Sequence, residues 1–362
     1  MLFKNNFLQI YKKPSIKKPE FYSYFCTRMN VDELNVLKQK LSSPTKIVIT
    51  THKGPDGDAM GSSLALYNYL IKKGHEVNVI TPNEYPKFLK WMKGDDKVIE
   101  FCYNEDKATK ITNDAEIIFC LDFNTLSRID TFEPIVAKSK AFKALIDHHQ
   151  QPDIFDFNYS DTNSCSTAQM IFEFISAFDD IDLIDKDIAE CIYAGILTDT
   201  GNFRFKSVTS RTHQVVAQLI NKGAQTHLVN DRIYDNNSIS KLKLLGYCLN
   251  DKLEVIPQYG SAIISLSHKE LDYFNFQKGD TEGVVNYALS IEGISVAAFF
   301  VERDGLIKIS FRSKGNFSVN QLARDHFNGG GHINAAGGAY GNDLQKAITK
   351  FKEILPQYIN TN

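Results

Sequence analysis

Four short apolar runs in the first part of the sequence constrain the fold more than any other feature. They span residues 46–51, 76–81, 116–122 and 143–147. Each run is continuous and bounded by loops, which is typical of strands buried on both faces of a parallel sheet. Helical patterns lie between or after them, at residues 61–73, 166–178 and 185–197. This alternation predicts an α/β domain with a parallel sheet and helices on both faces.

The pattern changes around residues 236–250, where residues 238–250 predict a helix that leads out of the first domain. Beyond it, we expect strands with clearer alternation at residues 252–256, 261–267, 296–302 and 306–311, then helices at 319–326 and 343–355 with a glycine-rich loop between them. A chain of 362 residues is comfortable for two domains. We therefore expect a first domain at residues 30–230, a helical linker at 231–250 and a smaller α/β domain at 251–362.

The first 28 residues carry six Lys or Arg and one acid, and they lack the uninterrupted apolar stretch of a secretory signal. We interpret residues 1–29 as an N-terminal extension that is either disordered or not translated, with translation beginning at Met29. A targeting role is left open.

Charge, hydropathy and cysteine usage exclude several classes of protein. The 41 Lys and Arg nearly balance 43 Asp and Glu, whereas a protein that coats long nucleic acid usually has a marked basic excess. No apolar run approaches the ~20 residues needed to span a bilayer. The six cysteines are scattered without a Cys-x-x-Cys pair, which argues against a disulfide framework and favours a reducing, cytoplasmic compartment.

Acidic and histidine residues follow the predicted strands. They are His52, Asp56 and Asp58 after the first strand, Asp122 at the end of the third, Asp147, His148 and His149 at the end of the fourth, and Asp199 after the helix at 185–197. The carboxyl ends of parallel strands meet at one edge of an open sheet, which is where ligands bind. We therefore expect these side chains to converge there.

Each of these residues alone has an ordinary explanation, such as a helix cap or a strand-end turn. Their convergence does not, because a buried carboxylate costs several kcal/mol unless it is paired or bound to metal. Lys53 is the only basic residue close to the four carboxylates in the sequence. Two divalent cations would neutralise them, and the mixed oxygen and nitrogen ligands favour Mn²⁺, with Co²⁺ and Mg²⁺ as alternatives.

The order of these motifs resembles that of the DHH phosphoesterase superfamily. The segment Gly329-Gly330-Gly331-His332-x-x-Ala335-Ala336-Gly337 similarly resembles its DHH-associated C-terminal domain. The resemblance runs from about Lys46 to the C-terminus. It is strongest to the subfamily of nanoRNases and phosphatases of 3′-phosphoadenosine-5′-phosphate (pAp). RecJ-type exonucleases carry additional domains, and manganese pyrophosphatases have a different C-terminal domain.

The resemblance implies roles for individual residues. One cation would be held by His52, Asp56 and Asp122. The other would be held by Asp58, Asp122, His148 and Asp199, so that Asp122 bridges the two. Asp147 would support the site and His149 would face the substrate phosphate. In the second domain, Arg312 would grip a phosphate, while Gly329, Gly330 and Gly331 would expose N–H groups as an anion nest beside His332.

The implied activity is hydrolysis by two metal ions, in a cleft between the domains. The expected substrates are short single-stranded oligoribonucleotides, cut to mononucleotides by an exoribonuclease activity, and pAp, converted to AMP and phosphate. A phosphodiesterase for cyclic or linear signalling dinucleotides is the alternative, and a non-catalytic nucleotide sensor is a third reading. We expect no membrane association and no stable complex with long nucleic acid, and a homodimer is left open.

Overall fold

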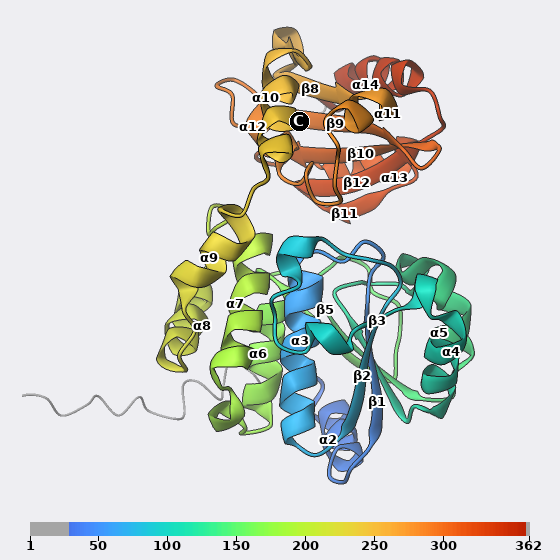
Figure 1. The fold of residues 1–362 in the computed structure, drawn as a ribbon, viewed down its shortest axis with the longest axis vertical. Helices are drawn as coiled ribbons and strands as arrows, with labels where there is room; N and C mark the ends of the chain where they lie inside the picture. The colour runs from blue at the N-terminus through green and yellow to red at the C-terminus, as the bar shows by residue number, and fades with distance from the viewer. Residues whose placement is uncertain (1–28, 360–362) are drawn as a thin grey trace, which may run out of the picture.

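The chain folds into two lobes in a computed structural model that describes residues 29–359 (Figure 1). The N-terminal extension expected at residues 1–29 lies outside these residues, apart from Met29, whose side chain is buried in the core of the first lobe. Helices α8 (Ser210–Asn221), α9 (Thr226–Tyr234) and α10 (Ile239–Asn250) lie along one side and lead from the first lobe to the second (Figure 1).

The first lobe is built on a six-stranded sheet in the order β3-β2-β1-β4-β5-β6, in which every pair is parallel. The strands are β1 (Lys46–Thr51), β2 (Glu76–Thr81), β3 (Ile99–Glu100), β4 (Ile117–Leu121), β5 (Phe142–Asp147) and β6 (Phe157–Ser160). The four predicted strands and their parallel arrangement are confirmed. The strand order reverses between β1 and β4, which opens a crevice at their carboxyl ends.

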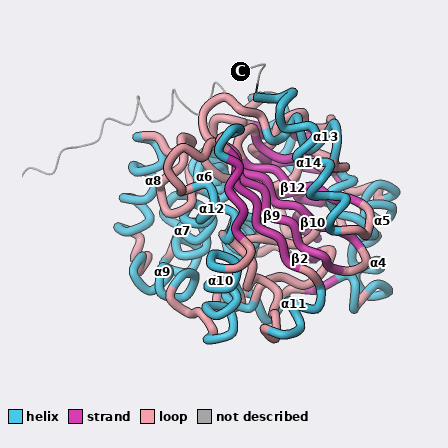
Figure 2. The backbone as a smooth tube through the Cα atoms, turned by 90° about the horizontal axis from the view of Figure 1, so that it is seen from above, coloured by secondary structure: helices cyan, strands magenta, loops and turns pink. Residues whose placement is uncertain are grey.

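Helices cover both faces of this sheet, as predicted. On one face lie α3 (Gly57–Lys72), α6 (Thr167–Ala177) and α7 (Lys186–Asp199), and on the other α4 (Glu105–Asp114) and α5 (Glu133–Lys138) (Figures 1 and 2). Successive residues of a strand point to opposite faces, so Ile47 and Ile49 join one buried cluster while Val48 joins another. Helix α2 (Val31–Lys40) packs beside β6 at the edge.

Helix α3 begins four residues before the predicted start at Gly61. The reason is Asp56, whose Oδ1 accepts hydrogen bonds from the N–H groups of Asp58 and Ala59 at 3.0 and 3.1 Å and caps the helix. Gly61 therefore lies inside the helix, where a Cβ atom would come within 2.5 Å of the Cys191 carbonyl oxygen in α7. The glycine serves close packing of α3 on α7 rather than a helix start.

The second lobe contains a separate six-stranded sheet in the order β11-β12-β10-β9-β8-β7. Its strands are β7 (Leu253–Ile256), β8 (Ser261–Leu266), β9 (Val296–Arg303), β10 (Leu306–Ser313), β11 (Gly330–His332) and β12 (Ala335–Tyr340). Of the pairs in this sheet that the structure describes, β8–β9 is parallel and the others are antiparallel. The predicted strands are confirmed, but the expected glycine-rich loop is wrong, because its residues form the β11–β12 hairpin.

Two helical layers sandwich the second sheet. Helices α13 (Val319–His326) and α14 (Leu344–Ile359) pack on one face around Phe300, Phe311 and Phe351. On the other face lie α10, α11 (His268–Tyr273) and α12 (Val284–Leu289). Leu244 and Cys248 of α10 are buried in this second core, so the predicted linker helix packs as part of the second lobe. The exact domain boundaries stay a prediction.

Among the described residues, no helix combines the length and apolar character needed to cross a membrane. The cysteines within this part of the chain are all free, as the sequence predicts: Cys102, Cys120, Cys165, Cys191 and Cys248.

Candidate metal centre

The predicted metal ligands meet at the carboxyl edge of the first sheet. They come from the loop after β1, the first turn of α3, the residue after β4, the loop after β5 and the last residue of α7. Among the described residues, ligand atoms within 4.8 Å of one another form four groups, and two of these consist only of predicted cation ligands: His52, Asp56 and Asp122, and Asp58, Asp122 and His148. Asp199 joins the second group, since its Oδ2 lies 3.5 Å from Nε2 of His148.

Both histidines of these groups present the same nitrogen to the carboxylates. Nε2 of His52 lies 3.5 Å from Oδ2 of Asp122, and its Nδ1 lies 3.0 Å from the carbonyl oxygen of Lys53. Nε2 of His148 lies 3.4 Å from Oδ1 of Asp122, and its Nδ1 lies 3.3 Å from the carbonyl oxygen of Ser164. A carbonyl can only accept, so each Nδ1 carries a hydrogen. In the neutral form of each ring, the lone pair of Nε2 is then available for a metal.

Asp122 lies between the two groups, with one carboxylate oxygen toward each histidine. Its backbone has φ = 63°, in the left-handed region that few residues other than glycine adopt. Such backbone conformations are unfavourable unless the surrounding structure stabilises them, and they are common at functional sites. Asp122 is common to both groups, and its role as a bridging ligand stays a prediction.

Helix α6 contacts the cluster through residues that the sequence analysis missed. Asp58 accepts hydrogen bonds from the N–H groups of Thr167 at 2.6 Å and Ala168 at 2.8 Å. The Thr167 hydroxyl donates to Asp122 Oδ1 at 3.0 Å. The sequence signal was limited to Ser166 before an apolar run, which predicts a helix start but not its position beside the carboxylates.

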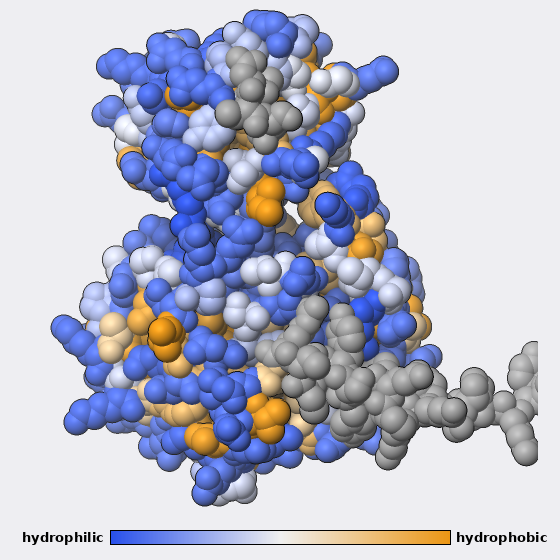
Figure 3. Space-filling view, turned by 180° about the vertical axis from the view of Figure 1, so that it is seen from behind, coloured by the Kyte–Doolittle hydropathy of each residue, from blue (hydrophilic) through white to orange (hydrophobic). Residues whose placement is uncertain are grey.

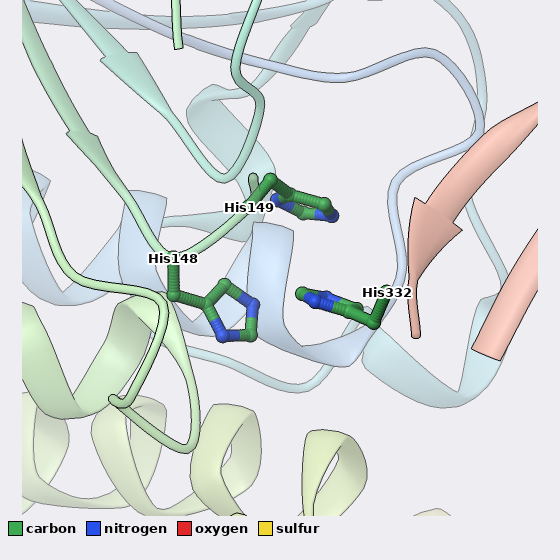
Figure 4. Close-up of side chains that lie close together, drawn as sticks. All are labelled: His148, His149 and His332. Atoms are coloured by element: carbon green, nitrogen blue, oxygen red, sulfur yellow. The ribbon is translucent and has the colours of Figure 1, made fainter. Parts of the chain in front are cut away.

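Asp147 and His149 form a pair at the opening of the cluster. Nδ1 of His149 lies 2.7 Å from Asp147 Oδ1, and the His149 N–H donates to Oδ2 at 3.1 Å. The ring of His332, from β11 in the second lobe, stacks on His149 with centroids 4.4 Å apart and planes inclined by 22° (Figure 4). The His332 centroid is also 4.6 Å from that of His148.

The electrostatics of the cluster are those of buried carboxylates without enough positive charge. Burial, reinforced by the charges of Asp122 and Asp199, raises the pKa of Asp58 well above its usual range. Burial also raises the pKa of Asp199 to about 6. For Asp122, burial is outweighed by hydrogen bonds to His148 and His52, which hold its pKa well below the usual range.

His148, which these carboxylates surround, also has a raised pKa. Burial would lower the pKa of His148, but the charges of Asp199, Asp122 and Asp58 outweigh burial and raise this pKa well above its usual range. Lys53, the nearest basic residue in the sequence, instead pairs with Asp130 at 2.7 Å. The carboxylate excess and the oxygen and nitrogen donors, with no sulfur, fit divalent cations.

Arg312 and His332 are the predicted site residues of the second lobe that lie next to the cluster. Nη1 of Arg312 donates to the Phe311 carbonyl at 2.9 Å, while its buried Nε has no hydrogen-bond partner in the structure. Burial lowers the pKa of Arg312, and the charges of Asp199 and Asp56 oppose this. Burial, followed by the neighbouring His148 and His149, lowers the pKa of His332 well below its usual range, so His332 is neutral.

The predicted anion nest at the glycines is corrected by their hydrogen bonds. The N–H of Gly329 donates to the Ala323 carbonyl at 3.1 Å, and that of Gly331 donates to Oδ1 of Asn320 at 2.9 Å. A Cβ atom would lie 2.0 Å from the Gly337 oxygen at Gly329 and 2.5 Å from the Ala335 oxygen at Gly331. These glycines therefore permit close approach of β11 and β12 rather than of an anion.

The loop after His149 also contacts the second lobe. Asn320 of α13 donates to Oε1 of Gln150 at 3.2 Å, and Arg324 donates to Oε1 of Gln151 at 2.8 Å. Asn320 also holds the Gly331 N–H, one residue before His332. These contacts lie at the narrow waist between the two lobes, which Figure 3 shows from behind.

Comparison with known proteins accounts for both lobes. The model of the DHH family, N-terminal domain, matches residues 46–196, and that of the DHHA1 domain matches residues 262–361. A bifunctional oligoribonuclease and PAP phosphatase NrnA from Thermus thermophilus is 31% identical over 318 residues, covering 85% of this chain and 89% of the relative. The chain belongs to the DHH family of phosphoesterases.

Two further relatives extend this similarity. An exopolyphosphatase-related protein from Bacteroides fragilis has a solved structure with a TM-score of 0.87 and 38% identity, covering 92% of this chain and 98% of its own. The cyclic-di-AMP phosphodiesterase GdpP from Bacillus subtilis is 26% identical over 340 residues, and the chain spans 49% of its length. This DHH phosphoesterase thus combines a DHH domain, which contains the His/Asp cluster, with a DHHA1 domain.

Proposed function

We propose that this DHH phosphoesterase is a Mn²⁺-dependent hydrolase of small nucleotides. It would cut short single-stranded oligoribonucleotides to mononucleotides and convert pAp to AMP and phosphate. The complete His/Asp cluster beneath His332 of the DHHA1 domain carries the proposal. The identity of about 30% with NrnA proteins, over most of both chains, supports the choice of substrates.

We propose His52, Asp56 and Asp122 as ligands of one cation, and Asp58, Asp122, His148 and Asp199 as ligands of the other. When bound, the two cations would supply an activated water and neutralise charge on the phosphate. The chain's own contribution is to fix the carboxylates before substrate arrives. Asp56 is fixed because its Oδ1 caps α3, and the same oxygen lies 3.9 Å from Nε2 of His52.

We propose His149 as the proton donor to the leaving oxygen. Asp147 accepts from Nδ1 and from the backbone N–H of His149, which fixes the ring and leaves Nε2 unbound by Asp147. A protonated His149 could then donate from Nε2 while Asp147 stabilises its charge. No side-chain nucleophile is needed.

Arg312 and His332 would bind the substrate phosphate from the DHHA1 domain. The unpartnered Nε of Arg312 lies among the charges of Asp199, Asp56 and Glu282, and a phosphate would give this buried guanidinium hydrogen-bond acceptors. Neutral His332 can donate one hydrogen bond without adding charge.

The two domains would close on one substrate, with α10 next to the hinge. Because His332 stacks on His149, a phosphate must displace the ring, so substrate entry requires the DHHA1 domain to move. A site closed between two domains favours short chains and disfavours a stable complex with long nucleic acid. We retain the proposed boundaries of residues 30–230 for the catalytic domain, 231–250 for the linker and 251–362 for the substrate-binding domain.

Hydrolysis of cyclic or linear signalling dinucleotides is the second candidate. The similarity to the cyclic-di-AMP phosphodiesterase GdpP, which covers 90% of this chain, favours it. A non-catalytic sensor has less support, because loss of a ligand would be its signature and every proposed ligand lies in the cluster.

A substrate panel with Mn²⁺ tests these candidates directly. It would contain pAp, a ribodinucleotide, a 5-mer, a 24-mer, a cyclic dinucleotide and pyrophosphate. Highest kcat/KM on pAp and the shortest oligonucleotides is the expected result. A preference for the cyclic dinucleotide would replace the proposed function by the second candidate, and no turnover of any substrate would refute both.

A further inference from the structure

Thr167 forms hydrogen bonds to two carboxylates of the metal cluster, those of Asp58 and Asp122. The backbone N–H of Thr167 donates to Oδ2 of Asp58 at 2.6 Å, and its hydroxyl donates to Oδ1 of Asp122 at 3.0 Å. Thr167 is fully buried at the first position of α6. A carboxylate oxygen can only accept, so the direction of both bonds is fixed.

The Thr167 hydroxyl is not needed to form the helix. Ser166 is the N-cap of α6, and its side chain already accepts from the Gln169 N–H at 3.0 Å. The backbone N–H bond to Asp58 would survive in any residue other than proline at this position. What the threonine side chain adds is therefore the hydrogen bond to Asp122.

Asp122 requires such a bond because little else in its own segment fixes its side chain. It follows the last residue of β4 and has a left-handed backbone. The charges of Asp58 and Asp122 repel each other across the cluster; burial first, and then the charge of Asp122, raises the pKa of Asp58. A hydroxyl donor on Oδ1 holds that oxygen toward His148 at 3.4 Å and leaves Oδ2 toward His52 at 3.5 Å.

We infer that Thr167 is a positioning residue for the metal centre, which holds Asp122 in the orientation that allows it to bind both cations. The inference rests on the proposed metal ligands and not on the identity of the substrate. Hydrogen-bond partners of metal ligands typically change metal affinity or activity by about 10- to 100-fold when they are removed.

Isothermal titration of the full-length protein with Mn²⁺ tests this inference. Thr167→Val keeps the shape and the backbone bond but removes the hydroxyl, and we expect about 10- to 100-fold weaker binding. Thr167→Ser restores the donor and should bind within about threefold of the wild type. Thr112→Val is the matched control, because Thr112 is also fully buried but its hydroxyl donates to the Ala108 carbonyl in α4, on the opposite face of the sheet.

Activity provides a second readout on whichever substrate the panel identifies. The deficit of Thr167→Val should shrink as Mn²⁺ is raised, whereas a general structural defect would persist at saturating metal. Equal Mn²⁺ affinity of Thr167→Val and the wild type, or failure of Thr167→Ser to restore binding, would overturn the inference. Absence of Mn²⁺ binding by the wild type would instead refute the metal centre and the inference together. Mn²⁺ binding without hydrolysis would refute only the proposed function.

Discussion

Asp122→Asn should be among the most damaging single substitutions in the protein. Asn has nearly the same shape as Asp, so the change tests the charge and ligand strength of the side chain rather than its volume. Asp122 is the residue common to both ligand groups, with Oδ2 3.5 Å from Nε2 of His52 and Oδ1 3.4 Å from Nε2 of His148. The substitution therefore weakens both proposed cation positions at once.

The magnitude follows from the number of contacts that change. One Asn oxygen can replace one carboxylate oxygen, but its amide nitrogen cannot bind a cation and would face either a histidine or the Thr167 hydroxyl. If each of the two cation positions loses about 30-fold in occupancy or reactivity, the combined loss is about 10³-fold, which corresponds to roughly 4 kcal/mol in the activation barrier.

The assay is kcat/KM on pAp at fixed Mn²⁺, together with the melting temperature of the metal-free protein. Asp130→Asn is a suitable control, because Asp130 also follows β4 and has a left-handed backbone, but it pairs with Lys53 at the surface. The control should retain activity within about threefold, since exposed ion pairs contribute little. An Asp122→Asn protein that is folded and keeps more than a tenth of the wild-type rate would refute the shared position of Asp122.

Three further results are expected. Arg312→Ala should lower kcat/KM on pAp by about 10- to 100-fold, because it removes a charge-assisted contact to the phosphate. Mn²⁺ binding measured by titration should stay unchanged. Loss of metal binding, or full activity on pAp, would contradict the role of Arg312 as a phosphate ligand. Oligonucleotides of two to five residues should be cleaved faster than a 24-mer and far faster than duplex DNA, and equal rates in a gel assay would contradict the closed cleft. The metal-free protein should lose thermal stability as pH rises above the ordinary histidine value of 6.5, because the pKa of His148 is raised in the folded protein. Such a group gives stability that is present below the unfolded pKa and is lost as pH rises through the folded pKa. Saturating Mn²⁺ should remove this pH dependence, and a flat metal-free profile would contradict the coupling of His148 to the carboxylates.

The sequence predicted four of the six strands of the first sheet and the residues at their ends, because both follow from local patterns. It did not predict β3 or β6. An apolar run of six residues such as Lys46–Thr51 has few alternatives to a buried strand, and its polar successor must lie at the carboxyl edge. The two-residue strand β3 has no such pattern, because its pairing depends on β2 rather than on its own residues. The start of α3 was predicted four residues too late, at Gly61, because the Asp56 cap decides the boundary and was not assigned to this helix from the sequence.

The contacts that arrange the candidate site could not be predicted from the sequence, because they join residues that are far apart in the chain. Thr167 and Asp58 are 109 positions apart, and no periodicity links the start of one helix to the start of another. Lys53 is adjacent to His52 in the chain, yet its charge is directed to Asp130. Proximity in sequence is therefore a poor guide to which charges meet in a buried cluster.

The glycine-rich segment at residues 329–338 was correctly matched to the DHH-associated domain, but its glycines do not form the predicted loop. Its small residues indicated close approach, and a hairpin does approach closely: a Cβ atom at Gly329 would lie 2.0 Å from the Gly337 oxygen. We therefore propose His332, rather than the N–H groups before it, as the functional group of this segment. The hairpin, tied to α13 through Asn320, determines where His332 lies over His149. We therefore expect the glycines to act on the substrate only through the position of the His332 ring, so that substitutions at Gly329 or Gly331 should disturb the same step as substitution of His332.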